Sequence, residues 1–100
     1  MVKIKEIELP NRLNVSLNVS ELREILQNIN EVDLLHLKND LIDIKIVKIE
    51  TGVTIYIVFG ERYKYINDDR GRWERVLNIV DDLEELAWFI NGLGIGRIAP

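Results

Sequence analysis

Four runs of strand-like residues, separated by links of only two residues, constrain the fold of this chain more than any other feature. The runs cover residues 32–38, 41–50, 53–59 and 61–66. The links between them are Asn39-Asp40, Thr51-Gly52 and Gly60-Glu61. Each link carries Asn or Gly, which accept the positive φ of tight hairpin turns, and links this short force antiparallel neighbours. We therefore expect a four-stranded antiparallel meander.

The alternation of apolar residues within residues 41–50 changes phase. Ile42, Ile44 and Ile46 fall on one face of the expected strand, whereas Val47 and Ile49 fall on the other. An extra residue inserted in a strand produces such a shift. We therefore predict a β-bulge near Ile46.

The amino-terminal third predicts a hairpin followed by a short helix. Residues 2–9 and 13–19 read as strands, and Pro10-Asn11 between them is a turn signal. Ser20 is suited to be the N-cap of a helix over about residues 21–29. The apolar positions of that helix recur at helical spacing and are Leu22, Ile25, Leu26 and Ile29.

A second, longer helix is predicted over about residues 70–91. Asp68 and Asp69 offer an N-cap, and Asn91-Gly92 is a typical stop. Its apolar stripe consists of Trp73, Val76, Leu77, Val80, Leu83, Ala87 and Ile90. The predicted order is ββαββββα. This is an α+β fold in which an antiparallel sheet, a hairpin plus a four-stranded meander, carries both helices on one face.

Composition places the chain among globular domains. Hydrophobic residues make up 47% and charged residues 30% of the 100 residues, so we read residues 1–100 as a single domain. The tail, residues 93–100, is expected to be mobile or docked on a partner. The chain has no cysteine, no metal-ligand spacing and no phosphate-binding glycine loop, so neither a metal nor a cofactor is predicted. Without an apolar run of signal-peptide or membrane-spanning length, we expect a cytoplasmic protein.

Apolar residues outside the main stripe of the long helix predict an interface. These residues are Ile79, Leu86, Trp88 and Phe89. A helix that is apolar nearly all round is usually buried on more than one side, and Trp and Phe are typical interface anchors. Two-fold homodimers are the commonest oligomers. The leading prediction is therefore a small non-enzymatic module that acts as a homodimer and either binds a protein partner or serves a regulatory role.

A basic and aromatic cluster within residues 62–75 supports an alternative, nucleic-acid binding. Its cations are Arg62, Lys64, Arg70, Arg72 and Arg75, interleaved with Tyr63, Tyr65 and Trp73. Arginines at a helix N-terminus can bind phosphate, and aromatic rings can stack on bases. Acidic residues in the same stretch favour an ion-paired surface instead, and the net charge of −4 mildly repels nucleic acid.

A third prediction is a Mg²⁺-dependent nuclease. Asp33, Asp43-Ile44-Lys45 and a helical Glu24 resemble the site of metal-dependent nucleases of the restriction-endonuclease type. The resemblance implies that the carboxylates hold Mg²⁺ while the lysine stabilises developing charge, and it covers only these four residues. Cross-strand pairing at the surface is the competing interpretation. His36, the only histidine, has Asp33 and Asp43 as candidate neighbours and is read as structural.

Overall fold

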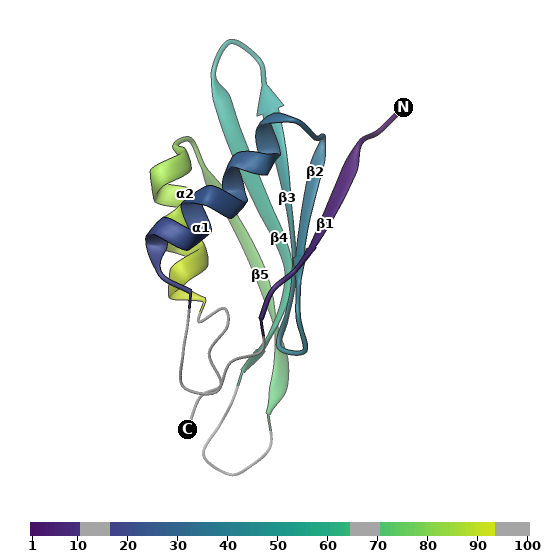
Figure 1. The fold of residues 1–100 in the computed structure, drawn as a ribbon, viewed down its shortest axis with the longest axis vertical. Helices are drawn as coiled ribbons and strands as arrows, with labels where there is room; N and C mark the ends of the chain where they lie inside the picture. The colour runs from purple at the N-terminus through teal and green to yellow at the C-terminus, as the bar shows by residue number, and fades with distance from the viewer. Residues whose placement is uncertain (11–16, 65–70, 94–100) are drawn as a thin grey trace.

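Five strands form one sheet, and two helices lie on the same side of it (Figure 1). The computed structural model describes residues 1–10, 17–64 and 71–93. The elements are β1 (Ile4–Glu8), α1 (Val19–Leu26) continued by a 3₁₀ turn η1 (Gln27–Asn30), β2 (Leu34–Lys38), β3 (Ile42–Glu50), β4 (Thr54–Lys64), β5 (Arg72–Val80) and α2 (Leu83–Gly92). The strands lie in chain order across the sheet. The α+β class with two helices is confirmed, but the predicted order of elements is wrong.

The first strand pairs in parallel with the second, so the predicted hairpin of residues 2–9 and 13–19 is wrong. Ile4 lies opposite Leu34, and Glu8 lies opposite Lys38. Parallel neighbours need a crossover of a dozen or more residues, usually a helix, and α1 with η1 supplies it. Val19 begins that helix, and residues 11–16 lie outside the described part of the chain.

The helix α1 begins earlier than predicted because Asn18, not Ser20, is its N-cap. The backbone N–H of Glu21 donates to Asn18 Oδ1 at 2.8 Å. In return, Glu21 Oε1 accepts from the Asn18 N–H at 3.4 Å, which completes a capping box. The alternating Asn and Ser residues that suggested a strand therefore end in a cap, and the apolar Leu22 and Leu26 enter the core.

Two of the three predicted hairpin links are present. Residues 39–41 turn between β2 and β3, and Gly52 adopts a φ of +86° between β3 and β4. The third link is wrong, because β4 continues through Gly60 to Lys64. The β-bulge is also wrong: the register of β3 with both neighbours is constant through Ile46 and Val47.

Gly60 is required in β4 because two backbones approach closely there. Its φ is +143°, and a Cβ at this position would collide with the backbone carbonyl of Asp43 in β3. Only glycine adopts this conformation readily while leaving space for the neighbouring carbonyl. The glycine that resembles a turn signal in the sequence is thus a strand residue at a close approach.

The predicted long helix over residues 70–91 divides into a strand and a shorter helix. Residues 72–80 form β5, antiparallel to β4, and Asp82 is the N-cap of α2, accepting from the Glu84 N–H at 3.3 Å. Trp73, Val76 and Val80 fit helical spacing, but aromatic and β-branched residues also favour strands, and β4 offers an antiparallel partner. Asp68, Asp69 and Arg70 lie outside the described residues.

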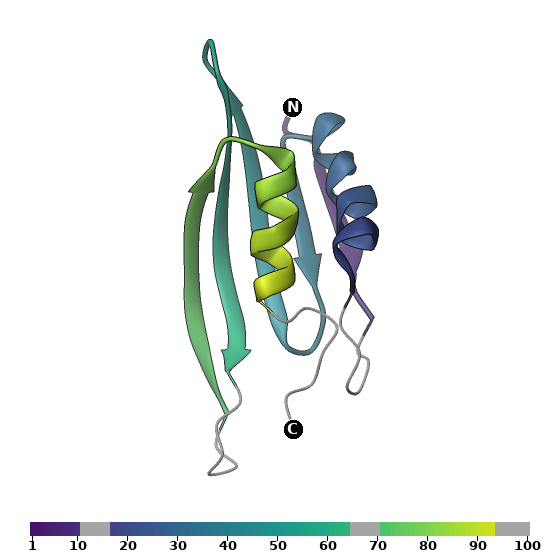
Figure 2. The same ribbon diagram turned by 90° about the vertical axis from the view of Figure 1, so that its left-hand side faces the viewer.

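Both helices lie over one face of the sheet (Figure 2), and the core lies between them and that face. Its fully covered side chains are Leu22, Leu26, Ile29, Leu35, Leu37, Ile44, Ile46, Val58, Leu86, Ala87 and Ile90. A two-pronged contact of Arg23 with Glu84, at 2.8 and 2.7 Å, joins α1 to α2. Neither helix within residues 1–10, 17–64 and 71–93 is long and apolar enough to cross a membrane.

We predict that Gly60→Ala lowers the free energy of unfolding by about 2–4 kcal/mol, because the added methyl group collides with the Asp43 carbonyl and alanine disfavours this φ. Gly92→Ala is the matched control, since a Cβ there meets nothing within 4 Å. Urea denaturation of the two variants measures the difference. Equal stability of both variants would contradict the close approach of β3 and β4.

Candidate functional site

The candidate site is the open face of the sheet, which we define as the face opposite α1 and α2. Side chains alternate between the two faces of a strand. Leu37, Ile44 and Val58 point into the core, so their sequence neighbours point the other way. The open face therefore carries the even-numbered residues of β1 and β2 and the odd-numbered residues of β3, β4 and β5. No element of the described residues covers it.

One half of the open face is apolar. A continuous row crosses all five strands in register and consists of Ile4, Leu34, Val47, Ile57 and Ile79. Phe59 and Leu77 lie beside this row, and Ile49 and Ile55 extend it toward the β3–β4 turn. We call these nine residues the apolar half. The exposed fraction reaches 63% for Ile4, 72% for Leu77 and 59% for Ile79.

An apolar open face is unusual for a sheet with water on one side. Antiparallel sheets of that kind alternate apolar residues inward with polar residues outward, whereas sheets buried on both faces are apolar throughout. Here β3 is apolar on both faces at Ile46 and Val47, and β4 is apolar on both faces over residues 55–59. Contiguous exposed apolar surface marks a site of interaction.

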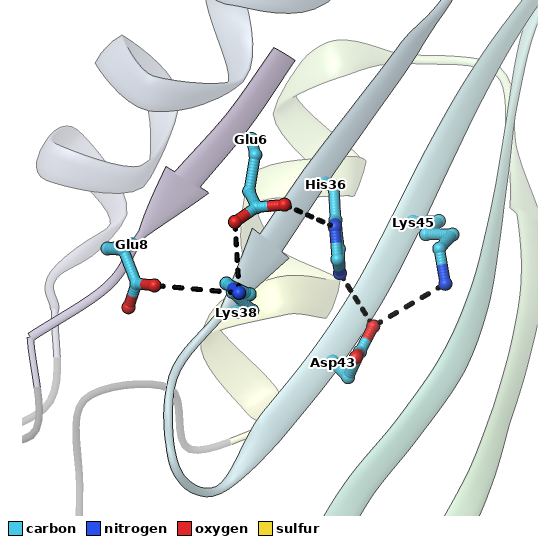
Figure 3. Close-up of polar contacts among 6 residues, drawn as sticks. All are labelled: Glu6, Glu8, His36, Lys38, Asp43 and Lys45. Atoms are coloured by element: carbon cyan, nitrogen blue, oxygen red, sulfur yellow. Dashed lines mark hydrogen bonds and ion pairs between the residues drawn. The ribbon is translucent and has the colours of Figure 1, made fainter. Parts of the chain in front are cut away.

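The other half of the open face is a network of charged side chains centred on His36 (Figure 3). The Nε2 atom of His36 lies 2.7 Å from Asp43 Oδ1, and its Nδ1 atom lies 3.5 Å from Glu6 Oε2. An ionised Asp43 can only accept, so Nε2 donates to it. The His36 side chain is only 15% exposed because β1 and β3 flank it.

Two lysines complete the polar network. Lys38 Nζ lies 2.9 Å from Glu6 Oε1 and 3.7 Å from Glu8 Oε1, and Lys45 Nζ lies 3.6 Å from Asp43 Oδ1. The hydrogen bond from Lys38 lowers the pKa of Glu6, and the same bond raises the pKa of Lys38. Partial burial raises the pKa of Asp43, but the hydrogen bond from His36 and the nearby positive charge outweigh it, so this pKa is lowered.

A hollow of about 380 Å³ lies over β4 where the two halves of the open face meet. Its lining on this face comprises Asp43, Lys45, Phe59, Glu61, Arg75 and Leu77. Neither Glu61 nor Arg75 forms an ion pair with another described residue. An open hollow that combines an aromatic ring with charges of both signs suits a protruding side chain of a partner.

The residues of the predicted nuclease site do not come together. The carboxylate of Asp33 accepts from the Lys3 backbone N–H at 2.7 Å, just before β2. Asp43 lies opposite Lys38 of β2. Lys38 is five residues beyond Asp33, so Asp33 and Asp43 are about 16 Å apart along the strand direction. Glu24 lies on α1, on the opposite side of the sheet. Among the described residues, no three His, Asp or Glu side chains form a group able to hold a metal ion.

The predicted basic cluster divides between the two faces of the sheet. Arg62 and Lys64 share one face and contact Glu74, at 2.8 and 3.7 Å, and Arg72 lies opposite Lys64 in the register. Arg75 lies on the open face, and Arg70 and Tyr65 lie outside the described residues. On the open face Tyr63 and Trp73 pack edge to face, with ring centres 5.6 Å apart. Because residues 72–75 form a strand, these arginines do not lie at a helix N-terminus.

The four predicted interface residues do not form one surface. Leu86 is completely buried in the core, and Phe89 packs against the core on α2. Trp88 is 59% exposed on α2, whereas the equally exposed Ile79 lies on the open face of the sheet. The reasoning from sequence missed Ile4, Leu34, Val47, Ile57 and Leu77. The apolar residues in both phases of residues 41–50 are a sequence signal for a second apolar face, but only the positions of α1 and α2 show that this face is uncovered.

Comparisons with known proteins add no relative. No family model matches this chain, and neither a curated protein nor a solved structure matches it.

We predict that Asp43 stabilises the protein at neutral pH and ceases to do so in acid. Its pKa is lower in the folded state, so its stabilisation is complete above its ordinary pKa of 3.8 and is lost as pH falls through the folded value. At pH 7, Asp43→Asn should cost less than about 1 kcal/mol, since the carboxylate is half exposed. Urea denaturation at fixed protein concentration, from pH 7 to pH 2, measures the difference.

The matched control for this titration is Glu85→Gln, which removes an exposed carboxylate of α2. The difference between wild type and Asp43→Asn should shrink below pH 4, while the control stays near wild type throughout. A difference that grew on acidification would contradict the contact between His36 and Asp43.

Proposed function

We propose that this protein is a small interaction module that forms a homodimer by burying its open face against the open face of a second copy. The observation that carries the proposal is a sheet that is apolar on both faces while helices cover only one. Exposed Leu77, Ile79 and Ile4 gain most from such burial. Each large aliphatic side chain contributes about 1.5–3 kcal/mol on going from full exposure to full burial.

The size of the open face is consistent with a stable dimer. Strands about 4.8 Å apart and central strands about 30 Å long give it roughly 600 Å² in plan. The relief of the side chains brings the accessible area near the ~800 Å² that each partner buries in a standard interface. One half of this area is apolar and the other half carries charges, so the dimer would bury apolar surface beside a charged region.

Pairing through the edge of the sheet is a less favourable route to the dimer. The outer strand β5 carries Arg72, Glu74 and Arg75, and charged residues discourage strand-to-strand association. The Ile79 backbone N–H already donates to Asn78 Oδ1 at 2.9 Å. A donor occupied by a side chain is not available to a new strand.

Nucleic-acid binding remains the weaker alternative. The charged residues of the open face are the carboxylates of Glu6, Glu8, Asp43 and Glu61 and the cations Lys38, Lys45 and Arg75. Carboxylates outnumber permanent cations, so this face lacks the positive field that phosphates require. Only the Tyr63 and Trp73 rings beside Arg75 favour the alternative.

We predict that the wild-type protein sediments as a dimer at micromolar concentration and that Ile79→Lys weakens the dimer about 30- to 100-fold. The substitution places a charge in the apolar half of both subunits, and burying an unpaired charge is costly. Ile79 is 59% exposed in one subunit, so the variant still folds. Sedimentation equilibrium gives the dissociation constant, and circular dichroism checks the fold.

The matched control is Trp88→Lys, which changes an equally prominent apolar residue on α2. It should dimerise like wild type. A wild-type protein that stays monomeric at all concentrations would overturn the proposal. An affinity for DNA or RNA that rises steeply as the salt concentration falls, and that is lost in Arg75→Ala, would favour the alternative.

A further inference from the structure

We infer that the two-fold axis of this dimer runs along β3, so that β1 of one copy faces β5 of the other and β2 faces β4. The inference rests on the proposed function and names the arrangement of the two copies. It follows from the order of apolar and charged rows across the open face. The strand register fixes the residues of the apolar row and of the charged row.

Symmetry leaves few ways for two identical sheets to face each other. The two-fold axis of such a dimer lies in the plane of the interface, and its limiting directions are across the strands or along them. An axis across the middle of the strands would turn the apolar half of one copy onto the charged half of the other. An axis along the strands sets the apolar row against the apolar row and the charged row against the charged row. In the row between them it sets Glu6 opposite the partner's Leu77 and His36 opposite the partner's Phe59.

The apolar row is self-complementary about an axis along the central strand. Ile4 on β1 would face the partner's Ile79 on β5, and Leu34 would face the partner's Ile57. Val47, on β3, would face the partner's Val47. All five members of the row therefore meet an aliphatic side chain.

The charged row is also self-complementary, and this is the stronger observation. Across the strands it reads Glu8, Lys38, Asp43, Glu61 and Arg75. Reversal of the strand order places Glu8 opposite the partner's Arg75 and Lys38 opposite the partner's Glu61. Both outer pairs are thus of opposite charge. The arrangement also gives ion-pair partners to Glu61 and Arg75, which have none among the described residues of one subunit.

The centre of the charged row brings Asp43 near its own copy. His36 and Lys45 contact each Asp43 carboxylate, which offsets the repulsion between them. The hollow over β4 faces the partner's β2 in this arrangement, so the partner's Lys38 lies above Glu61 and Phe59.

The twist of packed sheets leaves these pairs within reach. Two facing sheets cross at about 30°, which offsets the outermost strands by about 5 Å along their length. Successive residues on one face of a strand are about 7 Å apart, so the facing rows are displaced by more than half a row at the outermost strands and by about half as much at β2 and β4. Arginine, lysine and glutamate side chains are long enough to span the offset.

The test is a charge exchange between the two edge strands. Glu8→Lys and Arg75→Glu each place like charges opposite one another, and each should weaken dimerisation about five- to tenfold at low salt. The double variant, Glu8→Lys with Arg75→Glu, restores opposite charges and should return to within about twofold of wild type. Sedimentation equilibrium measures all four proteins.

Rescue in the double variant would report a contact between subunits. Within one subunit Glu8 and Arg75 lie four strand spacings apart, about 19 Å, which is too far for a direct contact. Glu85→Lys on α2 is the matched control and should leave the dimer unchanged. A dimer in which the double variant is no tighter than the weaker single variant would overturn the position of the axis and leave the proposed function intact. A wild-type monomer would overturn both.

Discussion

The fold depends on one constraint: a single layer of two helices can cover only one face of a five-stranded sheet. The apolar side chains of both helices are completely buried against the inner face; these are Leu22 and Leu26 of α1 and Leu86 and Ile90 of α2. The chain supplies no third helix among its described residues for the other face. The aliphatic row from Ile4 to Ile79 is therefore left to water in one subunit. Covering this row is the physical reason for proposing association.

Local signals in the sequence predict local structure well, and non-local pairing poorly. The turns at 39–41 and at Gly52, and the apolar spacing of α1, depend on residues close in sequence. The parallel pairing of β1 with β2 depends on contacts between Ile4 and Leu34, thirty residues apart, which no local pattern reveals. Residues 72–80 fit both helical spacing and strand alternation, and the choice between them is made by β4, which pairs with them.

The candidate site shows the same division between features set by residues close in sequence and features set by distant ones. The proximity of His36 to Asp43 follows from a short hairpin and could be anticipated from sequence, and the structure gives 2.7 Å between them. The phase change at Val47 and Ile49 is typical of a bulge, but the register of β3 is constant there. The two residues instead mark a second apolar face, and this cannot be recognised before the positions of both helices are known. Leu86 illustrates the converse, since α2 turns it inward rather than toward a partner.

Intermolecular contacts between methyl groups test the central claim most directly. In an equimolar mixture of methyl-labelled and unlabelled protein, isotope-filtered NMR detects only contacts between different copies. Contacts from the methyl groups of Ile57, Leu77 and Ile79 to the unlabelled copy are the result that the account predicts. A dimer whose intermolecular contacts arise only from α2, around Trp88, would contradict it, as would the absence of any intermolecular contact at millimolar concentration.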